Sequence, residues 1–401
     1  MPTPRSSEPD AAATPRPSRR SLLGAAGAAG ALGAVVAGAG PASAARARAA
    51  RTPLRFRQDG TFRVVQINDT QDDQRIDRRT VELIGAVLDE VRPDVVVVVG
   101  DIITDGPTTR LEALQALNNV VAPIEERGVA WAATFGNHDE DSTPLTGVDE
   151  AAVLGFFRRY PHNVNPPGAD VTGTGNGVLE VGSGAAGSRR AAAALWLLDS
   201  GRYRPDQIAG QSTESLEAYD WVRQDQVAWY ADTSRELERR NGRPVPGLAF
   251  AHIPLWEHRH MWWGSVEERT EASHEAAVRR HGITGERHER EYPGAFNSGL
   301  YAAMLGRGDV RGYYCGHDHI NTYDGDYYGV RLGYGPGTGF GTYGLGGERD
   351  HHLRGARVFE LSEDVEGALV STRPVFARDL GVDVSPGDQP RDPLPLPGWV
   401  R

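Results

Sequence analysis

Four short polar clusters interrupt this chain, and each one closes an apolar, strand-like run. The clusters are residues 68–71, 100–101, 136–139 and 316–319. The apolar runs before them are residues 62–67, 95–99, 129–135 and 310–315. In open α/β sheets, ligands bind just outside the carboxyl ends of the strands. Asp, Asn and His side chains that separate strands deliver to that edge predict a metal site.

The elements between the clusters alternate strand and helix. Residues 79–91 and 111–127 have apolar side chains at helical spacing, and the run 95–99 is five consecutive valines. This order predicts a parallel core sheet with helices as crossovers. Further along, the pattern predicts strands over 193–198 and 248–252 and a long helix over 216–240. Residues 258–292 are dense in His, Arg and Glu without a clear period, which is typical of a functional or disordered segment.

The composition excludes several kinds of chemistry. The chain of 401 residues has no Lys and a single cysteine, Cys315. A disulfide framework, a cysteine metal cluster, a phosphate-loop Lys and a Schiff-base Lys are therefore excluded. The formal net charge is −11, whereas nucleic-acid binders neutralise backbone phosphates with basic side chains. We expect no nucleic-acid partner, and the sequence carries no signal for an oligomeric state.

The first 44 residues have the pattern of a bacterial twin-arginine export signal. Arg19 and Arg20 precede a Gly- and Ala-rich apolar run, and Ala44 ends an A-x-A-like cleavage site. A membrane anchor is the alternative, but the run is short and only weakly apolar. We expect cleavage and export, without stable membrane insertion afterwards. Residues 45–55 are predicted to be a linker, and residues 383–401 a Pro-rich tail.

The cluster residues have the chemistry of metal ligands. Asp101 follows the valine run and could bridge two cations about 3.5–4 Å apart. Asp69 could bind one metal, and Asn137 offers a carbonyl oxygen to the other. Carboxylate and amide oxygens together with imidazole nitrogens suit Mn, Fe or Zn, and two adjacent metals favour phosphoester chemistry.

Four histidines complete the predicted site. His252 is the last residue of its own predicted strand, and His317 and His319 are two positions apart, which in an extended chain puts both on one side. All three offer imidazole ligands. His138 follows Asn137 directly, so it would lie near the metals without needing to bind them. That position leaves His138 free for proton transfer or phosphate contact.

These motifs resemble the calcineurin-like metallophosphoesterase superfamily, whose pattern is D-x-H, G-D, G-N-H-[DE], a lone His and G-H-x-H. The flanking sequence is similar to short plant purple-acid-phosphatase-like proteins and a fungal cell-cycle phosphatase. The resemblance implies an α/β sandwich of two mixed β-sheets flanked by helices over residues 56–382. It also implies hydrolysis of a small phosphomonoester or phosphodiester by a metal-activated hydroxide, without a covalent intermediate.

The resemblance assigns roles residue by residue. It places Asp69, Asp101 and His319 on the first of two divalent or trivalent metal ions. The second ion would be bound by the residues Asp101, Asn137, His252 and His317. His138 would contact the substrate phosphate and protonate the leaving oxygen.

The sequence departs from the family at Gln71, which stands where the His of D-x-H is usual. Gln71 could still offer a carbonyl oxygen as a weaker ligand to the first metal, or Asp72 could bind instead. The Asp that often pairs with the catalytic His is replaced by Thr104. A protein that binds metal or phosphate without catalysis is therefore the alternative, although it would not need His138. His258 and His260 could line the substrate pocket or lie in a surface loop.

Overall fold

The computed structural model describes residues 54–400. The chain divides into two units, residues 1–49 and residues 50–401. The predicted export signal, residues 1–44, lies outside the described residues. Residues 45–53, which form most of the predicted linker, also lie outside them. Within residues 54–400, every helix is too short or too polar to span a bilayer.

The first of two large sheets contains the three predicted parallel strands. Its five strands run in the spatial order β13–β12–β1–β2–β3. Their bounds are Leu369–Phe376 (β13), Gly355–Ser362 (β12), Thr61–Ile67 (β1), Val95–Val99 (β2) and Ala130–Thr134 (β3). β1, β2 and β3 are parallel, whereas β12 pairs antiparallel with both β1 and β13. The sheet is therefore mixed.

The second sheet is also mixed and has six strands in the order β10–β11–β9–β8–β5–β4. The bounds are Asp324–Tyr327 (β10), Val330–Tyr334 (β11), Val310–Cys315 (β9), Gly247–Phe250 (β8), Ala191–Leu197 (β5) and Gly177–Gly182 (β4). β11, β9, β8 and β5 are parallel, and the two edge strands are antiparallel. A separate two-stranded ribbon is formed by Gln207–Ile208 (β6) and Gln211–Ser212 (β7).

The valine run of β2 shows why the two sheets form a sandwich. Val95, Val97 and Val99 pack in the core between the sheets, together with apolar side chains of the second sheet such as Phe250. Val96 and Val98 point the other way, into the core beneath the helices. A strand buried on both faces has no polar face, so the run is continuous rather than alternating. Each fully buried valine contributes about 1.5 kcal/mol or more.

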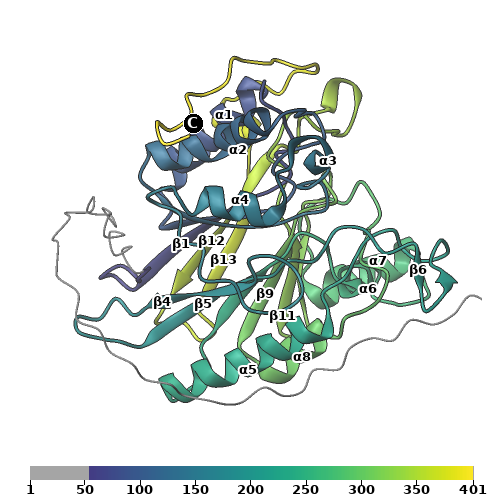
Figure 1. Cartoon of the computed structure of the whole chain (residues 1–401). Coiled ribbons are helices and arrows are strands. Elements are labelled where there is room, and N and C mark those ends of the chain that lie inside the picture. The colour runs from purple at the N-terminus through teal and green to yellow at the C-terminus, as the bar shows by residue number, and fades with distance from the viewer. Residues whose placement is uncertain (1–53, 401) are drawn as a thin grey trace, which may run out of the picture. The chain divides into compact units, whose positions relative to one another are not determined.

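Helices cover the outer face of each sheet (Figure 1). On the first sheet these are Arg78–Val91 (α1), Arg110–Glu126 (α2), Thr143–Thr146 (α3) and Glu150–Phe157 (α4). On the second sheet they are Gln224–Asn241 (α5), Trp256–Trp263 (α6), Glu271–His281 (α7) and Leu300–Arg307 (α8). The architecture confirms the predicted sandwich of two mixed sheets flanked by helices.

Two predictions of secondary structure were wrong. The helix expected over 216–240 begins only at Gln224, because the backbone around Tyr219 forms bridges to Tyr203 and Gly294. The segment 258–292, expected to lack regular structure, contains most of α6 and all of α7. Both helices pack through few buried side chains, such as Met261 and Ala277, so they have no apolar stripe in the sequence.

The Pro-rich C-terminal stretch packs onto the first sheet's helices over its described part. Gln389 N–H donates to Asp77 Oδ2 at 2.8 Å, directly before α1. Gln115 Nε2, on α2, donates to the carbonyl of Leu394 at 2.7 Å. The Trp399 ring lies 5.3 Å from that of Phe156 on α4. The stretch therefore links three helices of one layer.

Candidate metal centre

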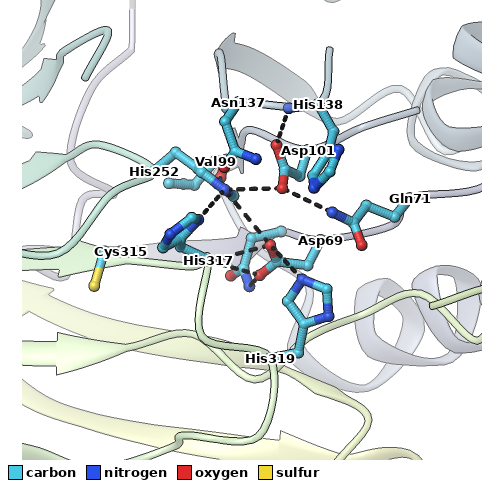
Figure 2. Close-up of polar contacts among 12 residues, drawn as sticks. Asp69, Gln71, Val99, Asp101, Asn137, His138, His252, Cys315, His317 and His319 are labelled. Atoms are coloured by element: carbon cyan, nitrogen blue, oxygen red, sulfur yellow. Dashed lines mark hydrogen bonds and ion pairs between the residues drawn. The ribbon is translucent and has the colours of Figure 1, made fainter. Parts of the chain in front are cut away.

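The predicted site residues converge at the carboxyl ends of strands from both sheets (Figure 2). The loops that carry them follow β1, β2 and β3 in the first sheet and β8 and β9 in the second. The residues concerned are Asp69, Gln71, Asp101, Asn137, His138, His252, His317 and His319. All of them except His138 are buried. The fold thus gathers these polar side chains, most of them buried, into one site.

The backbone at this site is strained. Eight residues other than Gly have positive φ angles within residues 54–400, and four of them belong to the cluster. The four angles are 50° at Asp69, 30° at Gln71, 49° at Asp101 and 74° at His317. Such angles are unfavourable for side chains with a Cβ atom and are concentrated at functional sites. Half of the positive φ angles of residues other than Gly in this range therefore fall in the candidate metal centre.

Two glycines let the ligand loops approach one another. A Cβ atom on Gly136 would lie 2.2 Å from Asp101 Oδ1 and 2.8 Å from His252 Cδ2. A Cβ atom on Gly316 would lie 2.6 Å from Asp69 Oδ2. These distances are far below van der Waals contact, so any larger residue would displace a ligand.

The acidic and imidazole side chains form two groups that share one carboxylate. Asp101, His252 and His317 form one group, and their ligand atoms lie within 4.8 Å of one another. The other group combines Asp101 with Asp69 and His319 under the same limit. Each group contains residues that the sequence assigns to one of the two ions, and Asp101 belongs to both. The roles of these residues as metal ligands, and of Asp101 as the bridge, stay predictions.

The hydrogen bonds of His252 aim one ring nitrogen at the centre. Its Nδ1 lies 2.9 Å from the carbonyl oxygen of Val99, which can only accept, so Nδ1 carries the proton. Nε2 faces Asp101 Oδ2 at 3.0 Å. Burial would lower the pKa of His252, but the charge and hydrogen bond of Asp101 and the charge of Asp69 raise it to about 10, so Nε2 also carries a proton, which a bound metal ion would displace. Such outer partners orient metal-binding imidazoles.

Burial sets the charge state of the neighbouring histidines. It lowers the pKa of His319 to about 3, and the nearby Arg354 adds to this effect. It also holds the pKa of His317 well below its ordinary value, with the charge of His252 acting in the same direction. Both rings are therefore neutral at pH 7, which is the form that binds metal.

The carboxylates respond differently to the same burial. Burial raises the pKa of Asp69 to about 6, although His252 opposes the shift. For Asp101, burial is outweighed by the charge and hydrogen bond of His252, which hold the pKa below its ordinary value. Asp101 therefore stays ionised, as a bridging ligand must be.

Asn137 supplies the most direct test of whether the site fits metal ions. Its Oδ1 is buried and has no hydrogen-bond partner among the described residues. Its Nδ2 lies 3.3 Å from the hydroxyl of Tyr203, so the amide has a preferred orientation. A buried carbonyl without a partner is costly, and a metal ion would satisfy it. The oxygen and nitrogen donors present fit the predicted ions.

His138 occupies the accessible side of the centre. Its backbone N–H donates to Asp101 Oδ1 at 2.8 Å, and its side chain is 39% exposed. Its Nδ1 lies 2.5 Å from Asp141 Oδ2, which leaves Nε2 as the free nitrogen. Burial alone would lower the pKa of His138, but the hydrogen bond to Asp141 and the charge of Asp101 raise it above its ordinary value.

Sequence reasoning missed Asp141, which supplies the carboxylate expected at position 104. Arg202 holds this carboxylate in place with one guanidinium nitrogen and bonds Glu140 Oε2 at 3.2 Å with another. Its Nε also donates to the carbonyl of Asn137 at 2.9 Å. The only signal in the sequence is the acidic run 139–141, which places a carboxylate three residues after His138.

Gln71 lies inside the centre with its amide oriented by two contacts. Nε2 donates to Asp101 Oδ2 at 2.8 Å, and Oε1 accepts from the Thr342 hydroxyl at 2.5 Å. The same hydroxyl lies 3.1 Å from His319 Nδ1. In this arrangement the amide oxygen faces Thr342 rather than the ligand atoms, and the role of Gln71 as a metal ligand stays a prediction.

Asp72 and His258 lie outside the two ligand groups. Asp72 accepts backbone N–H groups of Asp73 and Asp77 at 2.9 and 2.8 Å, so it stabilises its own loop. His258 is fully buried, and its Nδ1 accepts the backbone N–H of Leu255 at 3.2 Å. His258 is therefore neither a pocket residue nor part of a surface loop, because it packs in the core of the second sheet. His260 is partly buried on the same helix, α6.

Comparison with known proteins gives matches over most of the chain. The calcineurin-like phosphoesterase family matches residues 62–321. A probable inactive purple acid phosphatase 29 from Arabidopsis thaliana is 31% identical over 75% of this chain and 77% of that protein. The phosphatase DCR2 from Saccharomyces cerevisiae is 26% identical over 62% of this chain and 40% of that protein. A dimetal phosphatase structure from Danio rerio has a TM-score of 0.45 at 15% identity, covering 79% of this chain and 98% of that chain.

The chain belongs to the calcineurin-like phosphoesterase family. This confirms the resemblance that the four clusters suggested, including its subgroup of plant purple-acid-phosphatase-like and fungal phosphatase proteins. The family match covers the three clusters of the first sheet and the histidines that follow β8 and β9.

Proposed function

We propose that this protein is a metal-dependent hydrolase of small phosphoesters. Asp69, Asp101 and His319 would hold a first metal ion. A second ion would be held by Asp101 together with Asn137, His252 and His317. Two ions bound there would polarise a phosphoryl oxygen and lower the pKa of water, which is the chemistry that two-metal sites supply.

His138 carries this proposal, because its geometry serves catalysis rather than metal binding. Its Nδ1 is held by Asp141, so Nε2 is free to donate a proton to a leaving oxygen. A general acid needs a pKa near or above the working pH, and Asp141 and Asp101 both raise the pKa of His138 against the effect of burial. A protein that only binds metal would have no use for this arrangement.

The donor set supports Mn, Fe or Zn as the ions. Carboxylate and amide oxygens suit harder ions, and three imidazoles favour later transition metals. A small phosphoester is the substrate that such a site fits. The negative net charge of −11 argues against nucleic acid as the partner.

A metal- or phosphate-binding protein without turnover is the second candidate. Two observations favour it: Arabidopsis relatives carry the description "probable inactive", and Gln71 replaces an imidazole donor of the first site. The two candidates differ in what His138 does, since binding alone does not require it.

Turnover of phosphomonoester and phosphodiester substrates, with metal content measured on the same sample, tests the proposal. His138→Ala should retain both metals and lower turnover by roughly 10²–10⁴. His162→Ala is the matched control, because that ring is comparably exposed and contacts Glu125 far from the ligands. Metal-loaded protein without turnover would leave the binding protein as the better account.

We also propose export through the twin-arginine pathway, on the basis of Arg19, Arg20 and the cleavage pattern before Ala44. That pathway moves folded proteins, which suits an enzyme that loads metal inside the cell. Changing Arg19 and Arg20 to Gln should leave uncleaved precursor in the cell, whereas changing Arg5 and Arg16 should not. Normal amounts of mature protein outside cells that carry the paired change would refute this route.

A further inference from the structure

Tyrosine rings form the walls around the metal centre. Tyr343 stacks on His319, with ring centroids 4.2 Å apart and planes at 18°, and 53% of its surface is exposed. Tyr219 meets His317 edge-on at 4.2 Å and lies 6.0 Å from Tyr203. Tyr203 is 43% exposed and lies on the His138 side, 6.3 Å from that ring. We call Tyr203, Tyr219 and Tyr343 the tyrosine rim.

The two exposed rings of the rim are held in fixed orientations by their hydroxyl groups. Tyr343 donates to Glu289 Oε2 at 2.9 Å, and Ile320 N–H in turn holds Glu289 Oε1 at 3.0 Å. The Tyr203 hydroxyl lies 3.3 Å from Asn137 Nδ2 and 3.5 Å from Asp141 Oδ2. Rings fixed in this way offer flat contact faces at little cost in conformational entropy.

The arginines around the rim already have partners. Arg202 pairs with Glu140 and Asp141, and Arg290 pairs with Glu217 at 3.1 Å. Arg354, beside His319, donates to the backbone carbonyl of Thr342. Each of these three guanidinium groups already contacts a carboxylate or a backbone carbonyl. The rim therefore offers aromatic faces rather than positive charge.

We propose that the tyrosine rim selects phosphoesters that carry one phosphate and a planar, aromatic leaving group, as in an aryl monophosphate. The inference rests on the proposed function, because the phosphate must sit at the two metal ions. An aromatic group attached to that phosphate leaves the centre past Tyr203 or Tyr343, where offset or edge contacts with a ring are favourable. A polyanionic substrate would have to compete with Glu140, Asp141 and Glu217 for the arginines around the rim.

Binding of two phosphonates to the metal-loaded protein tests this inference without relying on turnover. Phenylphosphonate and cyclohexylphosphonate have the same phosphorus group and similar size, but only the first is planar. Calorimetry should show phenylphosphonate binding about 3- to 10-fold tighter, since aromatic pairs contribute about 0.5–1.5 kcal/mol beyond buried area. Simple apolar burial would instead favour the cyclohexyl compound or neither.

Substitutions assign the preference to particular rings. Tyr343→Leu and Tyr203→Leu should each reduce the ratio of the two affinities, and the double variant should bring it to about 1. The ratio cancels any loss of metal affinity, because both phosphonates need the same ions. Tyr328→Leu is the matched control, since that ring is 61% exposed and contacts His281 and Tyr327 instead.

Equal affinities in the unmodified protein, or an unchanged ratio in the double variant, would overturn the role of the rim and leave the proposed function intact. Failure of both phosphonates to bind metal-loaded protein would overturn the proposed function, and the inference with it.

Discussion

Replacing Asp141 by Asn tests how the catalytic role of His138 is set. Asp141→Asn keeps the size of the side chain and removes its charge. Asp141 Oδ2 lies 2.5 Å from His138 Nδ1, so the change removes a charge-assisted hydrogen bond to the ring. The metal ligands are untouched.

The size of the effect follows from the contact and its exposure. A hydrogen bond to a charged group contributes about 1.5–3 kcal/mol. His138 is 39% exposed, and solvent screens such a pair, so we expect about 1–1.5 kcal/mol. One pKa unit corresponds to 1.36 kcal/mol. The pKa of His138 should therefore fall by about one unit.

The direction of the change in activity depends on whether His138 acts in its protonated form. If His138 is a general acid, activity is lost as pH rises through its pKa, which Asp141 and Asp101 hold above the ordinary value against burial. Asp141→Asn should move this high-pH limb of kcat down by about one pH unit. At a pH above both limbs, kcat should be about tenfold lower.

A second variant separates the hydrogen bond from the ion pair with Arg202. Glu140→Gln removes the other carboxylate that Arg202 binds, at 3.2 Å, and leaves the contact between Asp141 and His138 in place. Its high-pH limb should stay where it is. If the high-pH limb of kcat stays in place in Asp141→Asn, or moves equally in Glu140→Gln, then the contact between Asp141 and His138 does not set the pKa of the general acid.

Three further changes probe the metal centre itself. Asp101→Asn should lose both metals, because this carboxylate belongs to both ligand groups; metal analysis of the purified variant that finds either site full would contradict it. Thr342→Val should lower the affinity for the first metal by about 10–100-fold, since it removes the hydrogen-bond partner of His319 Nδ1. Thr342→Ser keeps a hydroxyl and should restore that affinity in a metal titration. Gln71→His should add an imidazole donor and shift the first site towards Zn or Co over Mn; unchanged selectivity in competition titrations would argue that Gln71 lies outside the coordination sphere.

The ligand clusters could be predicted because their signals are local. Each lies within a few residues of the end of a strand, and strands such as β2 are marked by continuous apolar side chains. Parallel strands bring their carboxyl ends to one edge, so Asp69, Asp101 and Asn137 had to lie close together. The second sheet adds His252 and His317 by the same logic.

The residues around the ligands could not be predicted, because their contacts join loops that are distant in the sequence. Thr342 and Gln71 are 271 positions apart, and Arg202 reaches Asp141 across 61 positions. No spacing rule connects such pairs, since side chains of irregular loops have no fixed period. Tyr343 and Glu289 meet for the same reason, across 54 positions.

Helices α6 and α7 were missed on physical grounds of another kind. α6 mixes Trp, His and charged residues without an apolar stripe, α7 is mostly polar and charged, and few side chains of either helix are buried. α7 is stabilised at its start by Thr270, which caps Ser273 N–H at 3.1 Å, and at its end by Gly282 in the left-handed conformation. Capping of this kind is visible in the sequence only once the helix limits are known.

Metal titration of the metal-free protein, with turnover of an aryl phosphate recorded at each addition, tests the central claim most directly. We expect two ions bound per chain and turnover that rises with occupancy of the paired site. We also expect His138→Ala to bind the same two ions with turnover lower by roughly 10²–10⁴. Two bound ions without turnover, or turnover that is independent of metal, would contradict the proposal of a two-metal phosphoesterase.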